Sequence, residues 1–88
     1  MSYLSVEVVR KSCAFVLQIQ EPIDTLKKLA MFFQDRHLQI DSLQMHRFKN
    51  GEAMLIVHCQ IEKDRIMKIE ELIEQLPGII ELERMEGK

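Results

Sequence analysis

A strand-like run followed by a helix-like run occurs twice in this 88-residue chain, and this repetition constrains the fold more than any other feature. Residues 13–20 and 53–61 both place apolar side chains at every second position, which predicts strands with one fully apolar face. Each run is followed by apolar residues spaced three and four apart, as on one side of a helix. The chain is therefore expected to consist of two βαβ halves.

The first helix is predicted to begin near Pro22, because proline fixes φ and suits a turn into a helix. Asp24 follows, and its carboxylate is expected to cap the amides of the first turn. The stripe predicted to face the sheet is Ile23, Leu26, Leu29, Ala30 and Phe33, with Phe32 on its flank. The helix is expected to end within Asp35–His37, although no glycine stands there.

An Asn50-Gly51 pair lies between two alternating runs and predicts a β-hairpin. A strict two-residue turn would mix the apolar and polar faces of the two strands. A one-residue bulge keeps the apolar face whole. We therefore expect Met45 to pair with Val57, and Leu43 to pair with Cys59.

The second helix is expected to begin with Asp64 as a cap and to stop at Pro77-Gly78. Its buried stripe is predicted to be Ile66, Ile69, Leu72, Ile73 and Leu76. A last strand, at an edge of the sheet, is predicted for Ile79–Met85. The order βαββαβ with right-handed crossovers predicts an α+β ferredoxin-like sandwich, in which a four-stranded antiparallel sheet ordered 4-1-3-2 carries both helices on one face.

The other face of this sheet is expected to be bare and of mixed character. Its residues would be Val16, Gln18, Gln44, His46, Met54, Ile56 and His58, which suggests partial cover by another sheet or subunit. His46 and His58 would lie diagonally in the bulged register. Because no cysteine or carboxylate joins them, no metal site is predicted.

The chain is predicted to be one domain spanning residues 1–88. Residues 1–11 leave two possibilities open: an extension of the first strand, or a short extra strand that ends in a break at Arg10-Lys11-Ser12. Cys13 and Cys59 lie in apolar strand-like runs without CxxC spacing, so both are expected to be reduced core thiols.

Composition argues against several classes of partner. The net charge is −2 and both signs are scattered, so no nucleic-acid partner is expected. No apolar stretch of about eighteen residues could cross a bilayer, and no signal sequence begins the chain, so a cytoplasmic protein without a membrane partner is predicted. The sequence holds no GxSxG, phosphate-binding glycine loop or HExxH motif, so we expect neither an enzyme nor a cofactor.

The stretch QEPIDTLKKLAMFFQDRHLQIDSLQM, the run AMLIVHC and the run IMKIEELIEQL together resemble an ACT domain. The similarity is greatest to the ACT domain of the small regulatory subunit of acetohydroxyacid (acetolactate) synthase, an enzyme of branched-chain amino-acid synthesis. It rests on Phe32-Phe33, Arg36, Ile40-Asp41-Ser42-Leu43 and Gln75-Leu76.

This resemblance implies a regulatory domain that pairs edge to edge and binds an amino-acid effector between two subunits. The implied site combines the loop before the first helix with the start of the second strand, and its residues here are Glu21, Pro22, Ile23, Asp24, Gln39, Ile40 and Asp41. Asp24 stands where the family has glycine. If its carboxylate caps the helix, the amides that would hold an effector carboxylate are already occupied.

Two functions of different class follow. The first is a regulatory module that senses an amino acid or modulates a larger catalytic subunit. The second is an interaction module that retains the dimer and has lost the ligand. In both, we expect a homodimer through the second strand, because Ser42–Phe48 combines polar residues with apolar ones and would leave an unpaired edge.

Overall fold

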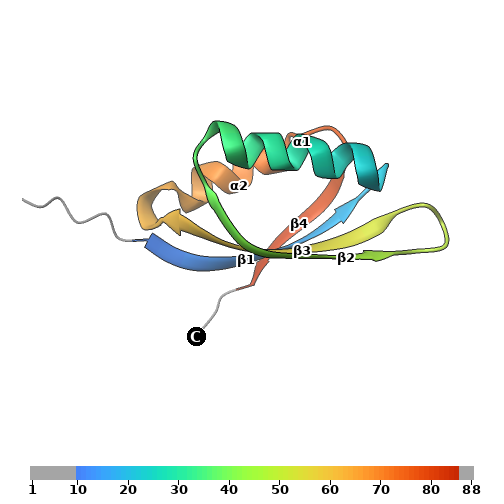
Figure 1. The fold of residues 1–88 in the computed structure, drawn as a ribbon, viewed down its shortest axis with the longest axis horizontal. Helices are drawn as coiled ribbons and strands as arrows, with labels where there is room; N and C mark the ends of the chain where they lie inside the picture. Colours follow the sequence, from blue (N-terminus) through green and yellow to red (C-terminus); the bar gives the residue numbers. More distant parts are fainter. Residues whose placement is uncertain (1–9, 86–88) are drawn as a thin grey trace, which may run out of the picture.

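The computed structural model describes residues 10–85, which form a four-stranded antiparallel sheet and two α-helices. The elements are β1 (Arg10–Ile19), α1 (Pro22–Asp35), β2 (Gln39–Arg47), β3 (Ala53–Glu62), a 3-10 turn η1 (Lys63–Arg65), α2 (Ile66–Glu74) and β4 (Ile79–Met85). The strand order is β2-β3-β1-β4, which is the predicted order read from the other edge. Both helices lie on the same face of the sheet, so the ferredoxin-like sandwich is confirmed (Figure 1).

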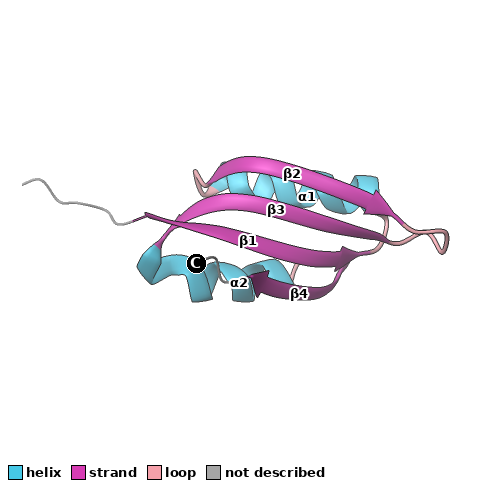
Figure 2. Cartoon of the chain, turned by 90° about the horizontal axis from the view of Figure 1, so that it is seen from below, coloured by secondary structure: helices cyan, strands magenta, loops and turns pink. Residues whose placement is uncertain are grey.

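The two central strands supply most of the core. β1 and β3 pair over ten residues, from Arg10 opposite Glu62 to Ile19 opposite Ala53. Every odd-numbered residue from 13 to 19 and from 53 to 61 is buried beneath the helices. The opposite face carries the predicted set from Val16 to His58, joined by Glu81 and Glu83 of β4, and Figure 2 shows that no helix covers it.

The buried side of α1 differs from the predicted stripe. Phe32 belongs to the core with 5% of its surface exposed, whereas Ile23 is 55% exposed and Ala30 faces solvent. The buried residues are Pro22, Thr25, Leu29, Phe32 and Phe33. The helix is rotated relative to the predicted phase because a buried threonine, which apolar periodicity does not count, lies against the sheet.

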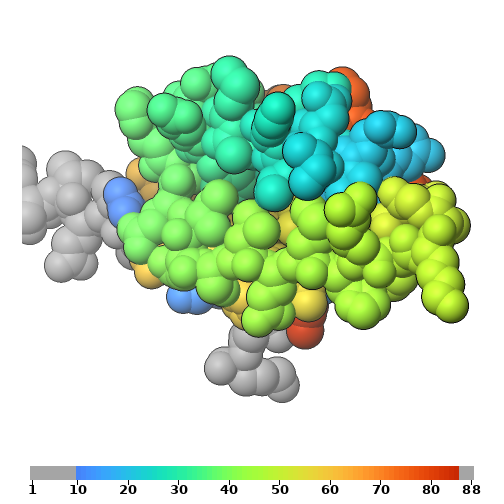
Figure 3. Space-filling model, turned by 45° about the vertical axis from the view of Figure 1, so that its right-hand side comes forward, coloured from blue at the N-terminus to red at the C-terminus, as the bar shows by residue number. Residues whose placement is uncertain are grey.

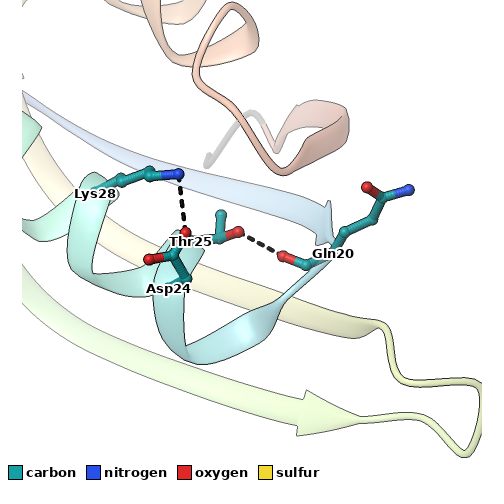
Figure 4. Close-up of polar contacts among 4 residues, drawn as sticks. All are labelled: Gln20, Asp24, Thr25 and Lys28. Atoms are coloured by element: carbon teal, nitrogen blue, oxygen red, sulfur yellow. Dashed lines mark hydrogen bonds and ion pairs between the residues drawn. The ribbon is translucent and has the colours of Figure 1, made fainter.

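Thr25 joins three parts of the chain at the beginning of α1. Its hydroxyl donates a hydrogen bond to the carbonyl of Gln20 at the end of β1 (Figure 4). The Gln20 amide in turn donates to the carbonyl of Gly78, at 2.7 Å, in the turn before β4. Thr25 is the one buried polar side chain among residues 10–85, and this contact satisfies it. The end of β1, the start of α1 and the turn before β4 are thereby held together.

The β2–β3 hairpin keeps the predicted faces but not the predicted pairs. Met45 lies opposite Leu55 and Leu43 opposite Val57, two residues away from the expected partners. The amide of Phe48 donates to the carbonyl of Glu52, so three residues lie in the loop between them, and Gly51 takes the left-handed φ of +91°. A second irregularity lies at the other end of β2, between Ile40 and Ser42.

This register separates the two histidines of the bare face. His46 pairs with Met54 and His58 pairs with Ser42, so their rows are four positions apart on β3, about 13 Å along the strand. The predicted diagonal placement is therefore wrong. Within residues 10–85, no group of three metal-binding side chains occurs.

β2 forms one edge of the sheet. In Figure 3 it runs as a light green band along the surface below α1, and the β2–β3 hairpin continues beyond it. Leu43 and Phe48 are 37% and 39% exposed on this edge. The edge predicted from the sequence is therefore present and accessible.

The start of the second helix also differs from the prediction. Asp64 lies within η1, and α2 begins only at Ile66 without a side-chain cap. The buried stripe is as expected, with Ile66, Ile69 and Ile73 in the core and Leu72 and Leu76 packed against it. The 3-10 turn places Arg65, instead of Asp64, at the N-terminal boundary of α2.

Strand β1 begins at Arg10, so the break considered at residues 10–12 is absent and these residues extend the strand. The rest of the proposed N-terminal extension, residues 1–9, lies outside the described residues, as do residues 86–88. Among the helices of residues 10–85, none has the length and apolar character needed to cross a membrane.

Replacing Gly78 by alanine is expected to destabilise the fold much more than the same change at Gly51. Both glycines have a left-handed φ, +93° and +91°, so alanine costs about 1–2 kcal/mol at either position. A Cβ at Gly78 would also overlap the Thr25 hydroxyl, whereas no atom lies within 4 Å of one at Gly51. Gly78→Ala should therefore cost about 1–3 kcal/mol more in urea unfolding. Equal losses would show that the Thr25 contact is unimportant.

Stability should fall at alkaline pH because of Cys59. Burial, and then the neighbouring Cys13 and Asp41, raise the pKa of its thiol from 9.0 to about 12. Between these values the unfolded chain loses the proton and the folded chain keeps it. The free energy of unfolding should thus decrease above about pH 9, by at most about 1.4 kcal/mol per pH unit. Thermal unfolding of Cys59→Val should show a shallower decrease, and parallel curves would contradict the assignment.

Candidate functional site

The loop before α1 presents backbone amides at a helix N-terminus. Glu21 is the N-cap residue in a left-handed conformation, with φ 46° and ψ 66°, which is uncommon for a residue other than glycine. Pro22 occupies the first turn and is buried, and it has no N–H to satisfy. No side chain caps this end of α1, so the amides of Ile23 and Asp24 point out of the helix without a side-chain acceptor.

Asp24 does not cap the helix, and that prediction was wrong. Because α1 begins at Pro22, Asp24 is its third residue, and its carboxylate lies 2.8 Å from the Lys28 ammonium one turn later (Figure 4). The hydrogen bond and charge of Lys28 lower the pKa of Asp24 below its ordinary value. The carboxylate is thus directed along the helix surface toward Lys28, and the first-turn amides stay unoccupied.

The start of β2 holds the other half of the predicted site. The Asp41 carboxylate accepts hydrogen bonds from the amide groups of Gln39, at 2.8 Å, and Gln60 of β3, at 3.2 Å. Ile40 is half-buried and packs against the core. Asp41 lies at the irregularity between Ile40 and Ser42, where the pairing of β2 with β3 shifts. These three predicted residues are therefore brought together.

The two halves of the site lie at opposite ends of the sheet within one chain. The α1 loop follows Ile19, whose partner Ala53 pairs with Arg47 at the far end of β2. Gln39 stands at the near end of that nine-residue strand, about 26 Å away. Figure 1 shows the same separation, with the start of α1 on the hairpin side and the start of β2 on the other. One chain alone cannot enclose a small ligand with both groups.

Sequence reasoning missed Thr25 and Lys28 as residues that shape the loop. Lys28 could have been found, because an acid and a base four residues apart on a helix form an ion pair. Thr25 gave no comparable signal. It bonds to the backbone carbonyl of Gln20 and packs against Gly78 in a distant turn, and neither contact follows a spacing in the sequence.

Comparison with solved structures identifies the architecture. The ACT domain of GTP pyrophosphokinase from Chlorobium tepidum superposes with a TM-score of 0.73 at 9% identity, covering 88% of this chain and 100% of that domain. The chain has the ACT-domain fold. No protein-family model matches the sequence, and a search of curated proteins finds no significant relative.

Two other solved structures share the ACT-like arrangement. The C-terminal domain of MgtC from Mycobacterium tuberculosis has a TM-score of 0.68 at 7% identity, covering 96% of this chain and 94% of that domain. A homoserine dehydrogenase from Thiobacillus denitrificans has a TM-score of 0.70 at 18% identity over 90% of this chain. The chain spans only 18% of that enzyme. In all three proteins the matching fold is one domain of a larger protein.

Proposed function

We propose that this chain is a non-catalytic regulatory domain that binds an amino acid at the N-terminus of α1. The observation that carries the proposal is the pair of first-turn amides, at Ile23 and Asp24, that no side chain caps. Such amides, with the positive end of the helix dipole, attract a carboxylate. Lys28 draws the Asp24 carboxylate to itself, which reduces the repulsion that an incoming carboxylate would meet.

The side chain of the effector is proposed to be apolar. The Ile23 side chain is 55% exposed beside these amides. Covering it with an apolar ligand side chain would remove apolar surface from water and so favour binding. This favours valine, leucine or isoleucine among the amino acids, in agreement with the resemblance to the small subunit of acetolactate synthase. The catalytic subunit of that synthase is accordingly the first partner to test, and the cytoplasm is the expected location.

A homodimer through β2 would complete the site. If two β2 edges pair antiparallel about a two-fold axis, Gln39 of one copy approaches the Arg47 end of the other. The α1 loop lies at that same end of the sheet. Glu21 and Asp24 of one copy would then face Gln39 and Asp41 of the second copy across the interface, as the family resemblance implies.

The exposed edge also favours the alternative function, an interaction module without a ligand. Leu43 on β2 and Phe48 just after it keep more than a third of their surface exposed, and an accessible edge strand with such residues tends to pair with another chain. This role needs the dimer but not the amides of α1. The two functions are separated by whether any amino acid binds.

A thermal-shift screen of the twenty amino acids tests the ligand. Valine, leucine or isoleucine at millimolar concentration should stabilise the wild-type chain, by about 2.7 kcal/mol at one hundred times Kd. Asp24→Asn should bind more tightly because the remaining repulsion is removed, while Asp64→Asn in η1 should behave like the wild type. If no amino acid shifts either form, the ligand-free interaction module is the correct function.

Light scattering with two matched variants tests the dimer. Leu43 lies at the middle of β2, so Leu43→Lys would place two like charges near each other across the two-fold axis. Ile80 is similarly exposed, at 43%, on the opposite edge strand β4. The wild type and Ile80→Lys should be dimeric at tens of micromolar, and Leu43→Lys should be monomeric. A monomeric wild type at this concentration would contradict pairing through β2.

A further inference from the structure

A basic hollow lies at the end of the sheet opposite the α1 loop, and it takes no part in the proposed amino-acid site. Its volume is about 230 Å³. It is formed where the end of α1, the start of β2 and the turn η1 meet the outer ends of β1 and β3. The charged and polar residues that matter here are Arg10, Arg36, His37, Gln39, Glu62 and Arg65.

The charge of this hollow is opposite to that of the chain. Three guanidinium groups and one carboxylate line it, a net charge of +2, whereas the whole chain carries −2. Glu62 accepts from Arg65 at 3.4 Å and so offsets one of the three cations. Arg10 and Arg36 form no ion pair with any residue in the range 10–85. The positive charges of Arg10 and Arg36 therefore remain uncompensated in this hollow.

The Arg36 guanidinium is held in position before any ligand arrives. It stacks on the Phe32 ring, with 3.9 Å between its central carbon and the ring centroid, and one nitrogen lies 3.5 Å from the Phe32 carbonyl. A guanidinium has five N–H donors in a planar fork, so most of them are still available to a ligand. Such a fork matches the oxygens of a phosphate group, and holding it in place lowers the entropic cost of binding.

His37 is kept at the hollow by an unusual backbone. The amide of His37 donates to the carbonyl of Gln34, and the amide of Leu38 donates to the carbonyl of Phe33. This is a Schellman end, whose left-handed position is normally glycine. His37 occupies it with φ 55°, at a cost of stability. Backbone strain is common at binding sites, so the left-handed His37 at a basic hollow motivates a binding role for its side chain.

We propose that this hollow binds a small phosphate-bearing anion, with Arg10 and Arg36 as the principal donors and His37 as a third. The volume suits one or two phosphate groups, and the two uncompensated charges match their negative charge. Gln39 contributes an amide to the same lining. Because the hollow is remote from the first turn of α1, the proposal does not depend on amino-acid binding.

Titration of the ¹⁵N-labelled full chain with inorganic phosphate, pyrophosphate, AMP and citrate tests the proposal. Phosphate and pyrophosphate should cause saturable shifts at residues 36–39 and 60–65, with pyrophosphate binding more tightly and raised salt weakening both. Tighter binding of AMP than of phosphate would identify a phosphate ester as the ligand, and the reverse would identify the inorganic ion. Binding of citrate alone, or of none of the four, would overturn the proposal.

Variants separate a specific site from general charge. Arg10→Gln and Arg36→Gln should each weaken pyrophosphate binding about tenfold or more. Arg84→Gln removes the same charge from β4, the edge strand opposite β2, and should leave binding unchanged. An equal loss in Arg84→Gln would show a non-specific effect of charge, and unchanged binding in both Arg10→Gln and Arg36→Gln would exclude the site.

His37→Gly gives a readout that a structural role alone would not produce. Glycine suits the left-handed position, so the variant should unfold at a higher temperature than the wild type. If the imidazole binds the anion, the same variant should bind pyrophosphate several-fold more weakly. A variant that is more stable and binds equally well would remove His37 from the site. Arg10→Gln carries the test if Arg36→Gln does not fold.

Discussion

The antiparallel pairing of β1 with β3 is the constraint on which the rest of the structure depends. Ten consecutive pairs bring two strictly alternating strands into one register, so that all of their odd-numbered core residues face the helices together. Side chains alternate with period two, so a slip of one residue would turn this apolar face to water. Both helices, both edge strands and the bare face are defined relative to this pair.

The Thr25 contact then decides how the N-terminal end of α1 is presented. A buried hydroxyl bonded to Gln20, with Gly78 packed against it, holds the first turn of the helix close to the sheet. This arrangement turns Ile23 outward and leaves Asp24 beside Lys28. The proposed amino-acid site therefore results from a packing contact on the other side of the helix, because the orientation of one face of a helix determines the orientation of all others.

The two ends of the sheet differ in chemistry. At one end, uncapped amides and an apolar side chain suit a carboxylate on an apolar molecule; at the other, Arg36, His37 and Arg65 line a hollow with excess positive charge. Antiparallel pairing through β2 would bring unlike ends of two copies together. An amino-acid site and an anion site could then lie near each other in the dimer, although they are remote within one chain.

Local patterns in the sequence determined the elements, their order and the central faces, because periodicity of two or of three to four depends only on neighbouring residues. The tertiary structure alone decided three further features. The phase of α1 follows from Thr25 packing against Gly78, which is far away in the chain, and the β2–β3 register follows from the geometry of the loop at Gly51. The basic hollow exists only because five separate elements meet at one place, which no spacing along the chain encodes.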